Sequence, residues 1–422
     1  MSRRLNLRRV AFVLVALFQV MLLTFMGTAA VFPPPLSRTL TEWTIPGCVN
    51  TIIPGANPGD PPFIIPGCEP LHPIVFSTRD IFFTERRANK IGRLDPVSNV
   101  LTEWPLPTLP NPIPAPPIRP PLQAAPHGIV QFQRGVIFCE TGKGMIGFLD
   151  PVTNELKEWQ VPFFLFDPPG PALPVPVSSS PLHPDHKGQR VYFSLNRTNS
   201  IAALDATQDR ITEWPIPTQA SGVNGVLVHG NRVFFAEVGT DKIGMLDPHD
   251  NTITEWQLAP DSFPQHLVAA GRYVFFVESG GNRIGRLDPH TNIITEWEIP
   301  TPASNPADID VLDANTIIFT ESEGNKIGQL KALEECGVSV AVAPTVTPVT
   351  PSETAAPVFV TPLTPVSVNV PPTRTAVPGV ESCGFTEWTL PTPESVPVGI
   401  KRYKGREVVF CETQTNRIGI LR

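Results

Sequence analysis

The sequence predicts an all-β protein, a seven-bladed β-propeller with four-stranded blades. Two motifs carry this prediction, because each occurs seven times along the 422 residues. A run of aromatic and β-branched residues is followed by Asn-Lys-Ile-Gly or a variant of it, as in 81–92 and 274–285. A four-stranded repeat of about 40–50 residues is typical of a propeller blade. The other motif is Thr/Lys-Glu-Trp, which contains every tryptophan: Trp43, Trp104, Trp159, Trp214, Trp256, Trp297 and Trp388.

Each repeat predicts four strands, A to D. Strand A is a short apolar stretch such as 128–130, and strand B is the Phe-rich run, whose residues suit a pleated surface. Strand C holds Lys-Ile-Gly-Arg-Leu, and strand D carries Ile/Leu-Thr-Glu-Trp. The globular part begins with a lone strand D at Trp43 and ends with a lone strand C at 417–421. Pairing of these two strands would complete the seventh blade and remove its exposed edges.

Composition and charge narrow the class further. The 52 prolines argue against long helices. A net charge of -7 without a basic stripe argues against a nucleic-acid partner. Residues 1–32 contain four arginines and then an apolar run at 11–32, which predicts a signal peptide or an N-terminal membrane anchor. We therefore expect a monomeric propeller over 40–422 that is secreted or anchored to the outer face of the cytoplasmic membrane.

Several connections are longer than the repeat requires. Residues 44–70, 105–125 and 160–182 link strand D of one blade to strand A of the next, and we expect them on one face, the top. Residues 333–384 form a Pro/Thr/Val-rich low-complexity insertion within blade six. This insertion is predicted to leave from the opposite face and to be flexible or extended.

Six cysteines fit an oxidising compartment. Cys48 and Cys68 bracket one insertion and Cys336 and Cys383 bracket another, so each pair is expected to form a disulfide. The remaining two, in Phe-Cys-Glu-Thr sequences of two strands B, are interpreted as small buried hydrophobic residues.

Histidines gather where strand A is expected to line the central channel at the top rim. Three successive blades hold His72, His127 and His183 there, with His186 as the alternative to the third. Histidine is well suited to proton transfer near neutral pH, and an ordinary polar lining is the competing interpretation. The same place in the other blades is assigned to Asn224, His266, Ala307 and Val398.

Strand B ends in glutamate in six of the seven blades, which favours a structural role in pairing with Lys or Arg of strand C. Only Glu140 is singled out as a candidate metal ligand or proton-transfer group, because it belongs to the same blade as His127 and lies near the same rim.

These motifs resemble the streptogramin B lyases, also called virginiamycin B lyases. The shared pattern is Pro-His-Gly-Ile at 126–129, Phe-Thr-Glu at 83–85, Asn-Lys-Ile-Gly-Arg at 89–93 and Ile-Thr-Glu-aromatic at 211–214. The resemblance implies a seven-bladed propeller that opens a small cyclic ester or peptide substrate by C–O elimination, using Mg²⁺ and a histidine base.

By this resemblance His127 is the expected general base, His72 the second functional histidine and Glu140 the magnesium-associated acid. His183 stands where the family presents an aromatic hydroxyl group. The chain departs from the family pattern in its Leu-His-Pro sequence at 71–73, its long top insertions and its exported N-terminus.

Two other functions stay open on the sequence. One is a non-catalytic cell-surface propeller that binds a peptide, a sugar or another protein at the top face. The other is a lactone hydrolase of a different propeller family, whose calcium site would need clustered acids and asparagines, of which only Asn224 is evident.

Overall fold

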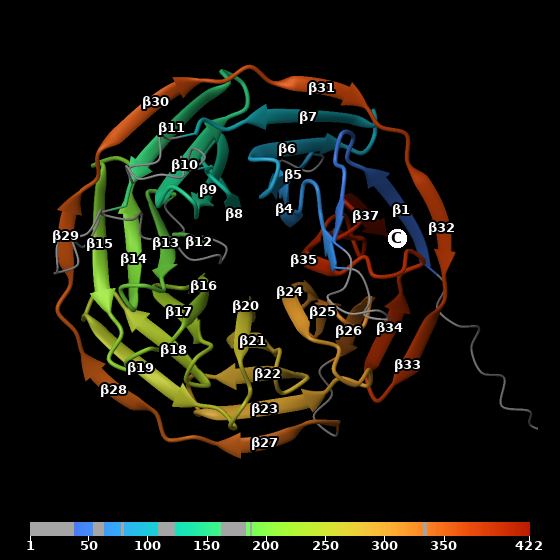
Figure 1. Ribbon diagram of the computed structural model, residues 1–422. Coiled ribbons are helices and arrows are strands. Elements are labelled where there is room, and N and C mark those ends of the chain that lie inside the picture. The colour runs from blue at the N-terminus through green and yellow to red at the C-terminus, as the bar shows by residue number, and fades with distance from the viewer. Residues whose placement is uncertain are drawn as a thin grey trace, which may run out of the picture. The chain divides into compact units, whose positions relative to one another are not determined.

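The computed structural model shows seven sheets arranged around a central channel (Figure 1). Each of these sheets has five strands, so the seven-bladed propeller is confirmed and every blade has one strand more than predicted. The structure describes residues 38–53, 63–76, 80–108, 123–161, 183–185, 188–331 and 336–422.

Strands A to D of each blade follow one another from the channel outward. Blades 1 and 2 consist of β4 (Pro70–Phe76), β5 (Asp80–Glu85), β6 (Lys90–Asp95), β7 (Val100–Pro105), β8 (Pro126–Phe132), β9 (Gly135–Glu140), β10 (Met145–Asp150) and β11 (Glu155–Gln160). Blades 3 and 4 consist of β12 (His183–Pro184), β13 (Arg190–Leu195), β14 (Ser200–Asp205), β15 (Arg210–Pro215), β16 (Val223–His229), β17 (Arg232–Glu237), β18 (Lys242–Asp247) and β19 (Thr252–Gln257).

The remaining blades follow the same plan. Blade 5 consists of β20 (Pro264–Ala270), β21 (Tyr273–Glu278), β22 (Arg283–Asp288) and β23 (Ile293–Glu298). Blade 6 consists of β24 (Pro306–Asp313), β25 (Thr316–Glu321), β26 (Lys326–Lys331) and β34 (Phe385–Thr389). Blade 7 consists of β35 (Pro397–Arg402), β36 (Val408–Glu412), β37 (Arg417–Leu421) and β1 (Arg38–Thr44).

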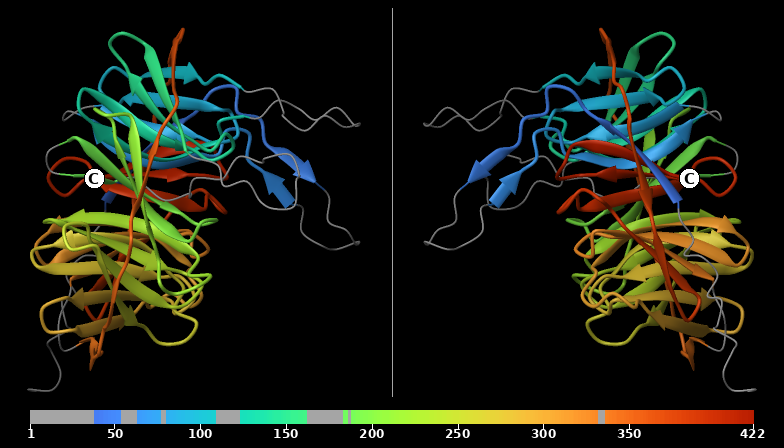
Figure 2. Two further views of the ribbon diagram at one scale, coloured as in Figure 1. Left: turned by 90° about the vertical axis from the view of Figure 1, so that its left-hand side faces the viewer. Right: turned by 90° about the vertical axis from the view of Figure 1, so that its right-hand side faces the viewer.

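The predicted closure of the ring is confirmed. Strand β1 pairs antiparallel with β37, with Trp43 opposite Ile418. The first described residues thus complete the blade that the last residues begin. The hairpin of β2 (Thr51–Ile53) and β3 (Phe63–Ile65) follows β1 and projects from one face of the propeller (Figure 2).

The fifth strand of every blade comes from the low-complexity insertion. Residues 338–382, here called the belt, run around the outside of the propeller and appear as an orange-to-red ring in Figure 1. The segment is extended, as one of the two predicted states, but its pairing with all seven blades was not predicted. Its strands are β27 (Val338–Ala341) on β23, β28 (Thr345–Pro348) on β19, β29 (Ser352–Ala355) on β15, β30 (Val358–Pro362) on β11, β31 (Val366–Asn369) on β7, β32 (Thr373–Val377) on β1 and β33 (Gly379–Ser382) on β34.

A period of seven residues explains why this sequence forms the belt. Every seventh belt residue places its side chain in, or against, a hydrophobic cluster that lies between two blades. Each of these clusters contains one tryptophan. The backbone N–H of each seventh residue donates to a carbonyl in the C-to-D turn of one blade at 2.7–2.8 Å. Seven extended residues span about 23 Å, so one heptad bridges neighbouring blades. These repeating residues are Val342, Val349, Ala356, Leu363 and Val370.

In blades 1 to 5, the same C-to-D turn also joins the blade to the one before it. In blade 4, the indole Nε1 of Trp214 donates to the side-chain oxygen of Asn251 at 2.8 Å, while the carbonyl of Asn251 accepts the belt N–H of Val349. Asn251 has a φ of 53°, a left-handed conformation that asparagine tolerates better than most residues. The equivalent indole bonds are Trp43–Asn99, Trp104–Asn154, Trp159–Asp209 and Trp256–Asn292.

Both predicted disulfides are present. Cys336–Cys383 joins the two ends of the belt, so the ring around the propeller is covalently closed. Cys48–Cys68 closes the connection that carries the β2–β3 hairpin. Cys139 and Cys411 are buried in strands B, as expected for small hydrophobic residues.

The predicted export segment at residues 1–32 lies outside the described residues. Within the described ranges, none of the chain forms a helix of the length and apolar character needed to cross a membrane.

Loss of the belt disulfide should loosen the belt selectively. We expect Cys336→Ser with Cys383→Ser to lower the free energy of unfolding by about 4 kcal/mol, because the bond closes a long loop in the unfolded chain. Hydrogen exchange at the belt amides, measured by mass spectrometry, should accelerate in this variant. The Cys48→Ser, Cys68→Ser variant should leave belt exchange unchanged; equal exchange in the two variants would contradict a closing role for Cys336–Cys383.

Two substitutions at one turn should separate its two roles. Asn251→Gly keeps the left-handed conformation accessible and removes only the acceptor of the Trp214 indole, at an expected cost of about 1–2 kcal/mol. Asn251→Ala loses the same acceptor and adds about 1 kcal/mol of backbone strain. Thermal unfolding of both variants measures the difference, and an alanine variant at least as stable as the glycine variant would contradict the assignment.

Candidate functional site in the central channel

A β-bulge at the start of strand A shapes the channel rim. In blade 2, Pro126 lies opposite Glu140 and Ile129 lies opposite Phe138, so two rim residues, His127 and Gly128, share the space of one. Blades 1, 4, 5, 6 and 7 have register shifts at the corresponding place. We call the two residues rim position 1 and rim position 2.

The pairing of strand A with strand B shows that the candidate histidines lie at three different depths along the channel, not at one. His127 occupies rim position 1, together with Asn224 and Gln265 of blades 4 and 5. His72 and His266 occupy rim position 2, one residue later than their sequence alignment with His127 implied. His183 lies opposite Tyr192, which places it at the level of Val130, deeper along the channel. His186 lies outside the described residues.

Rim position 2 holds a buried polar cluster. His72, His266 and Asp308 are 4%, 8% and 2% exposed. The Nδ1 of His266 is 2.7 Å from Oδ1 of Asp308, and the imidazole centroids of His72 and His266 are 5.1 Å apart. The backbone N–H groups of Ile309 and Ile400 donate to the two carboxylate oxygens of Asp308 at 2.8 and 2.9 Å. The carboxylate is therefore held in a fixed orientation.

Glycines at the same position of other blades make room for this cluster. A Cβ on Gly225 would lie 2.3 Å from the Gln265 carbonyl, and a Cβ on Gly399 would lie 2.7 Å from the backbone of His72. Neighbouring strands A therefore approach too closely for a side chain at every rim position 2. His72 itself has a φ of 42°, a strained conformation of the kind that collects at functional sites.

Sequence reasoning missed two charged members of the channel, Asp308 and Lys401. It assigned Ala307 to the rim in place of the adjacent Asp308, because the bulge shifts the inward-facing residue by one. In blade 7 it assigned Val398, three residues before Lys401. The signal was present: Pro-Ala-Asp-Ile at 306–309 carries an acid where blades 2, 4 and 7 have glycine.

Electrostatics in the channel favour the ionised carboxylate of Asp308 and the neutral imidazole of His72. Burial, assisted by the charge of nearby His266, lowers the pKa of His72 to about 3. Burial alone would raise the pKa of Asp308, but the charges of Lys401 and His266 hold that pKa well below its usual range. Burial would lower the pKa of Lys401, but Asp308 and Asp310 raise it.

His127 lies at the mouth of the channel. Its side chain is half-buried, its ring centroid is 4.9 Å from that of His72, and its carbonyl accepts a hydrogen bond from the Thr84 hydroxyl at 2.7 Å. The structure therefore brings together the two histidines that the sequence singled out first.

A cavity of about 230 Å³ lies in the channel below the mouth. His183, Lys401 and Asp310 line it together with His266 and Asp308, and aliphatic residues of the other strands A complete its wall. Burial lowers the pKa of His183 to about 4. His183 thus faces the same channel as the rim histidines but at a deeper level.

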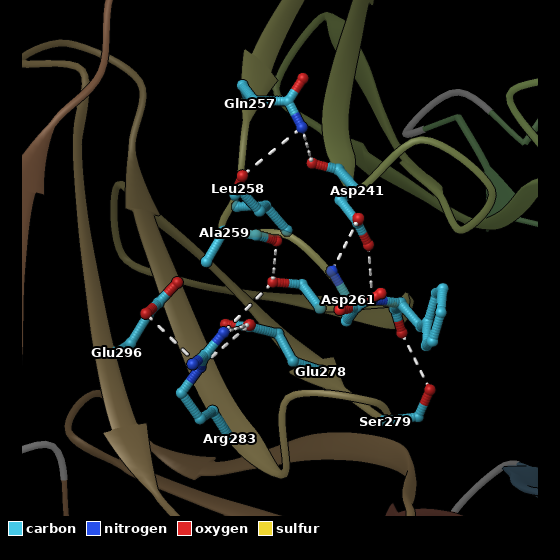
Figure 3. Close-up of polar contacts among 11 residues, drawn as sticks. Asp241, Gln257, Leu258, Ala259, Asp261, Glu278, Ser279, Arg283 and Glu296 are labelled. Carbon is cyan, nitrogen blue, oxygen red and sulfur yellow. Dashed lines mark hydrogen bonds and ion pairs between the residues drawn. The ribbon is translucent and has the colours of Figure 1, made fainter.

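Side chains of the B-to-C turns fix the backbone that leads into strand A. Asp241 accepts the backbone N–H groups of Asp261 and Phe263, both at 2.9 Å, just before β20 carries His266 into the channel (Figure 3). Asn282 does the same for blade 6, accepting the N–H of Ser304 at 2.8 Å before the strand that carries Asp308.

The glutamates that end strand B are buried inside the blades. The predicted pairing with a cation of strand C is seen for Glu278, whereas the cations of strand C in blades 1, 4, 6 and 7 pair with glutamates of strand D. Glu278 Oε2 accepts from Arg283 at 2.8 Å, and Glu296 of strand D is 3.4 Å from the same guanidinium (Figure 3). A buried and a partly exposed carboxyl group thus share one cation. Burial and the charge of Glu255 raise the pKa of Glu237 to about 8 in the equivalent arrangement of blade 4.

Glu140 is buried in such a cluster. It is fully inaccessible and forms an ion pair with Lys143 at 2.6 Å, and Lys143 also contacts Glu158. Burial raises the pKa of Glu140 well above its usual value. Mg²⁺ prefers several ionised oxygen ligands and keeps part of its water shell. The setting of Glu140 therefore does not fit the role of magnesium-associated acid that the family resemblance implies.

The raised pKa of Glu237 predicts an unusual dependence of stability on pH. Because the folded state holds a proton on Glu237 between about pH 4.5, the ordinary value, and about pH 8, its contribution to stability falls as the pH rises through that window. Glu237→Gln mimics the protonated acid, so its melting temperature should rise relative to wild type by about a few °C between pH 5 and pH 9.

The control for this experiment is Glu298→Gln, an exposed glutamate on β23. Its melting temperature should track wild type across the same pH range. A constant difference between Glu237→Gln and wild type from pH 5 to pH 9 would show that the acid is ionised throughout.

Fold and site together define a class: a seven-bladed propeller whose channel mouth presents histidine from the first residues of strand A. The Virginiamycin B lyase family model matches residues 62–330. The chain therefore belongs to the virginiamycin B lyase family, as the sequence motifs indicated.

Solved structures agree on the fold. A streptogramin B lyase structure superposes with a TM-score of 0.62 at 20% identity, covering 91% of this chain and 98% of that one. Virginiamycin B lyase from Staphylococcus aureus gives 0.60 at 21% identity, with 84% and 94% covered. A catalytically inactive form of the S. aureus enzyme with quinupristin gives 0.60 at 20% identity, with 89% and 99% covered. No curated protein matches the chain significantly.

Proposed function

We propose that this protein is an exported lyase that opens an ester bond in a small cyclic molecule by C–O elimination, with His127 as the base. The observation that carries the proposal is the position of His127, half-buried at rim position 1 and packed on His72, in the Pro-His-Gly-Ile sequence of the family. Two disulfides agree with a protein that folds outside the reducing cytosol.

In the proposed reaction, a neutral imidazole of His127 removes a proton from the carbon beside a substrate carbonyl. The electrons of that C–H bond form a C=C bond, and the adjacent C–O bond breaks so that the ester oxygen leaves as part of a carboxylate. The product is linear and has the mass of the substrate, because no water is added.

The surroundings of His127 suit this role. Its partial burial removes bulk water from one side of the ring, and the ring of His72 beneath it fixes its position. Below His72, the ionised Asp308 favours positive charge in the channel and would stabilise the imidazolium that forms. A bound Mg²⁺ would polarise the substrate carbonyl, but Glu140 does not fit it as a ligand, so no step is assigned to the ion.

The activity test uses quinupristin, the cyclic ligand of the S. aureus structure, with the purified chain and mass spectrometry. We expect a linear product of unchanged mass, and a loss of at least about 100-fold in rate for His127→Ala. His290→Ala, an exposed histidine on a C-to-D turn, is the matched control and should react as wild type. Wild-type rates in His127→Ala would overturn the assignment of the base, and a product heavier by one water would indicate hydrolysis.

A binding protein without catalysis is the second candidate, and one feature of the top face favours it. A cavity of about 360 Å³ lies between blades 6 and 7, where Ile64 of the projecting hairpin faces Asn325, Val396 and Gln414. Binding of a ligand without turnover would favour this function over the lyase. In that case Ile64→Asp should weaken binding and His127→Ala should leave it unchanged.

A further inference from the structure

We propose that His72, His266 and Asp308 form a binding site for a divalent first-row transition metal ion, such as Zn²⁺, in the centre of the channel. One donor atom of each residue lies within 4.8 Å of the donors of the other two, close enough for a single ion after small side-chain adjustments. Two imidazole nitrogens and one carboxylate oxygen suit Zn²⁺ and similar ions, whereas Mg²⁺ prefers oxygen alone.

The state of His72 points to a missing ligand. Its Nδ1 is buried and has no hydrogen-bond partner among the residues that the structure describes. A buried ring nitrogen without a partner loses its hydration without replacement, which destabilises the folded state. Its backbone is strained at a φ of 42°, which packing must maintain. Coordination to a metal ion would satisfy the nitrogen and account for the strain.

Asp308 and His266 already have the arrangement that metal sites use. The carboxylate is oriented by two backbone N–H groups, those of Ile309 and Ile400, and bonds to Nδ1 of His266 at 2.7 Å. The donor atoms of Asp308 and His266 thus already face each other, and a bound ion would displace the proton between them. Only small movements are therefore needed for binding.

Charge and space around the cluster also permit a cation. Asp308 and Asp310 supply two negative charges against the single positive charge of Lys401. The cavity of about 230 Å³ borders His266 and Asp308, so the ion would keep room for a water or another small ligand beside its three protein donors. Three protein ligands with one open position are the usual plan of catalytic zinc sites.

This site shares His72 and Asp308 with the surroundings of the proposed base, but His127 is not one of its donors. It uses rim position 2, whereas the proposed base is at rim position 1, and its residues come from blades 1, 5 and 6 rather than from blade 2. Metal binding without lyase activity, or activity without metal binding, would each bear on only one of the two proposals.

The test is metal binding by the full chain, with Zn²⁺ and Co²⁺ as probes. We expect one equivalent of Zn²⁺ per chain by elemental mass spectrometry, and a visible absorption spectrum on adding Co²⁺ that Zn²⁺ abolishes. His72→Ala, His266→Ala and Asp308→Asn should each weaken Zn²⁺ binding at least 10-fold. His249→Ala and His290→Ala, which change exposed turn histidines, should bind as wild type.

Thermal unfolding keeps the result interpretable if a variant folds poorly. Zn²⁺ should raise the melting temperature of wild type and of the two control variants, but not that of any folded cluster variant. A wild-type chain that binds no stoichiometric Zn²⁺ or Co²⁺ overturns the proposal. So does a His72→Ala or His266→Ala chain that binds Zn²⁺ with wild-type affinity.

Discussion

The turn between strands C and D is the point on which the rest of the structure depends. In blade 4, Asn251 adopts a left-handed conformation, accepts the indole of the preceding blade through its side chain and accepts the belt through its carbonyl. One residue thus joins two blades and the belt. Repetition of this contact in blades 1 to 5 ties neighbouring sheets together, and the pairing of β1 with β37 completes the last blade of the ring.

The chemistry of the channel arises where the repeat is broken. Strands A of blades 2, 4 and 7 carry glycine at rim position 2, because their neighbours approach closely. Three blades replace this glycine with His72, His266 and Asp308, whose side chains occupy the space that the glycines leave. The B-to-C turns hold each strand A by hydrogen bonds to its approach, so the odd residues are positioned by the same scaffold as the ordinary ones.

The fold was predictable because every blade repeats the same two motifs, and counting them gives both the number of blades and the way the ring closes. The meeting of His72 with His127 followed from the same alignment. The bulge hid Asp308, since an inserted residue changes which side chain faces inward without changing the motif. The level of His183 is set by its pairing with Tyr192. The belt was missed for a different reason. Its period of seven is short and built from Val, Thr and Pro, so its composition resembles low complexity while its spacing records contacts with strands far away in sequence.

The belt sets a limit on how this protein can evolve. Propellers commonly change size by gaining or losing whole blades, since each blade is a self-contained repeat. Here every blade is matched by one strand of a belt whose two ends are joined by Cys336–Cys383. A duplicated blade would have no belt strand to pair with, and loss of a blade would leave one belt strand unpaired. The number of blades can therefore change only together with the number of belt strands. These are encoded by different segments of the gene, which would both have to change.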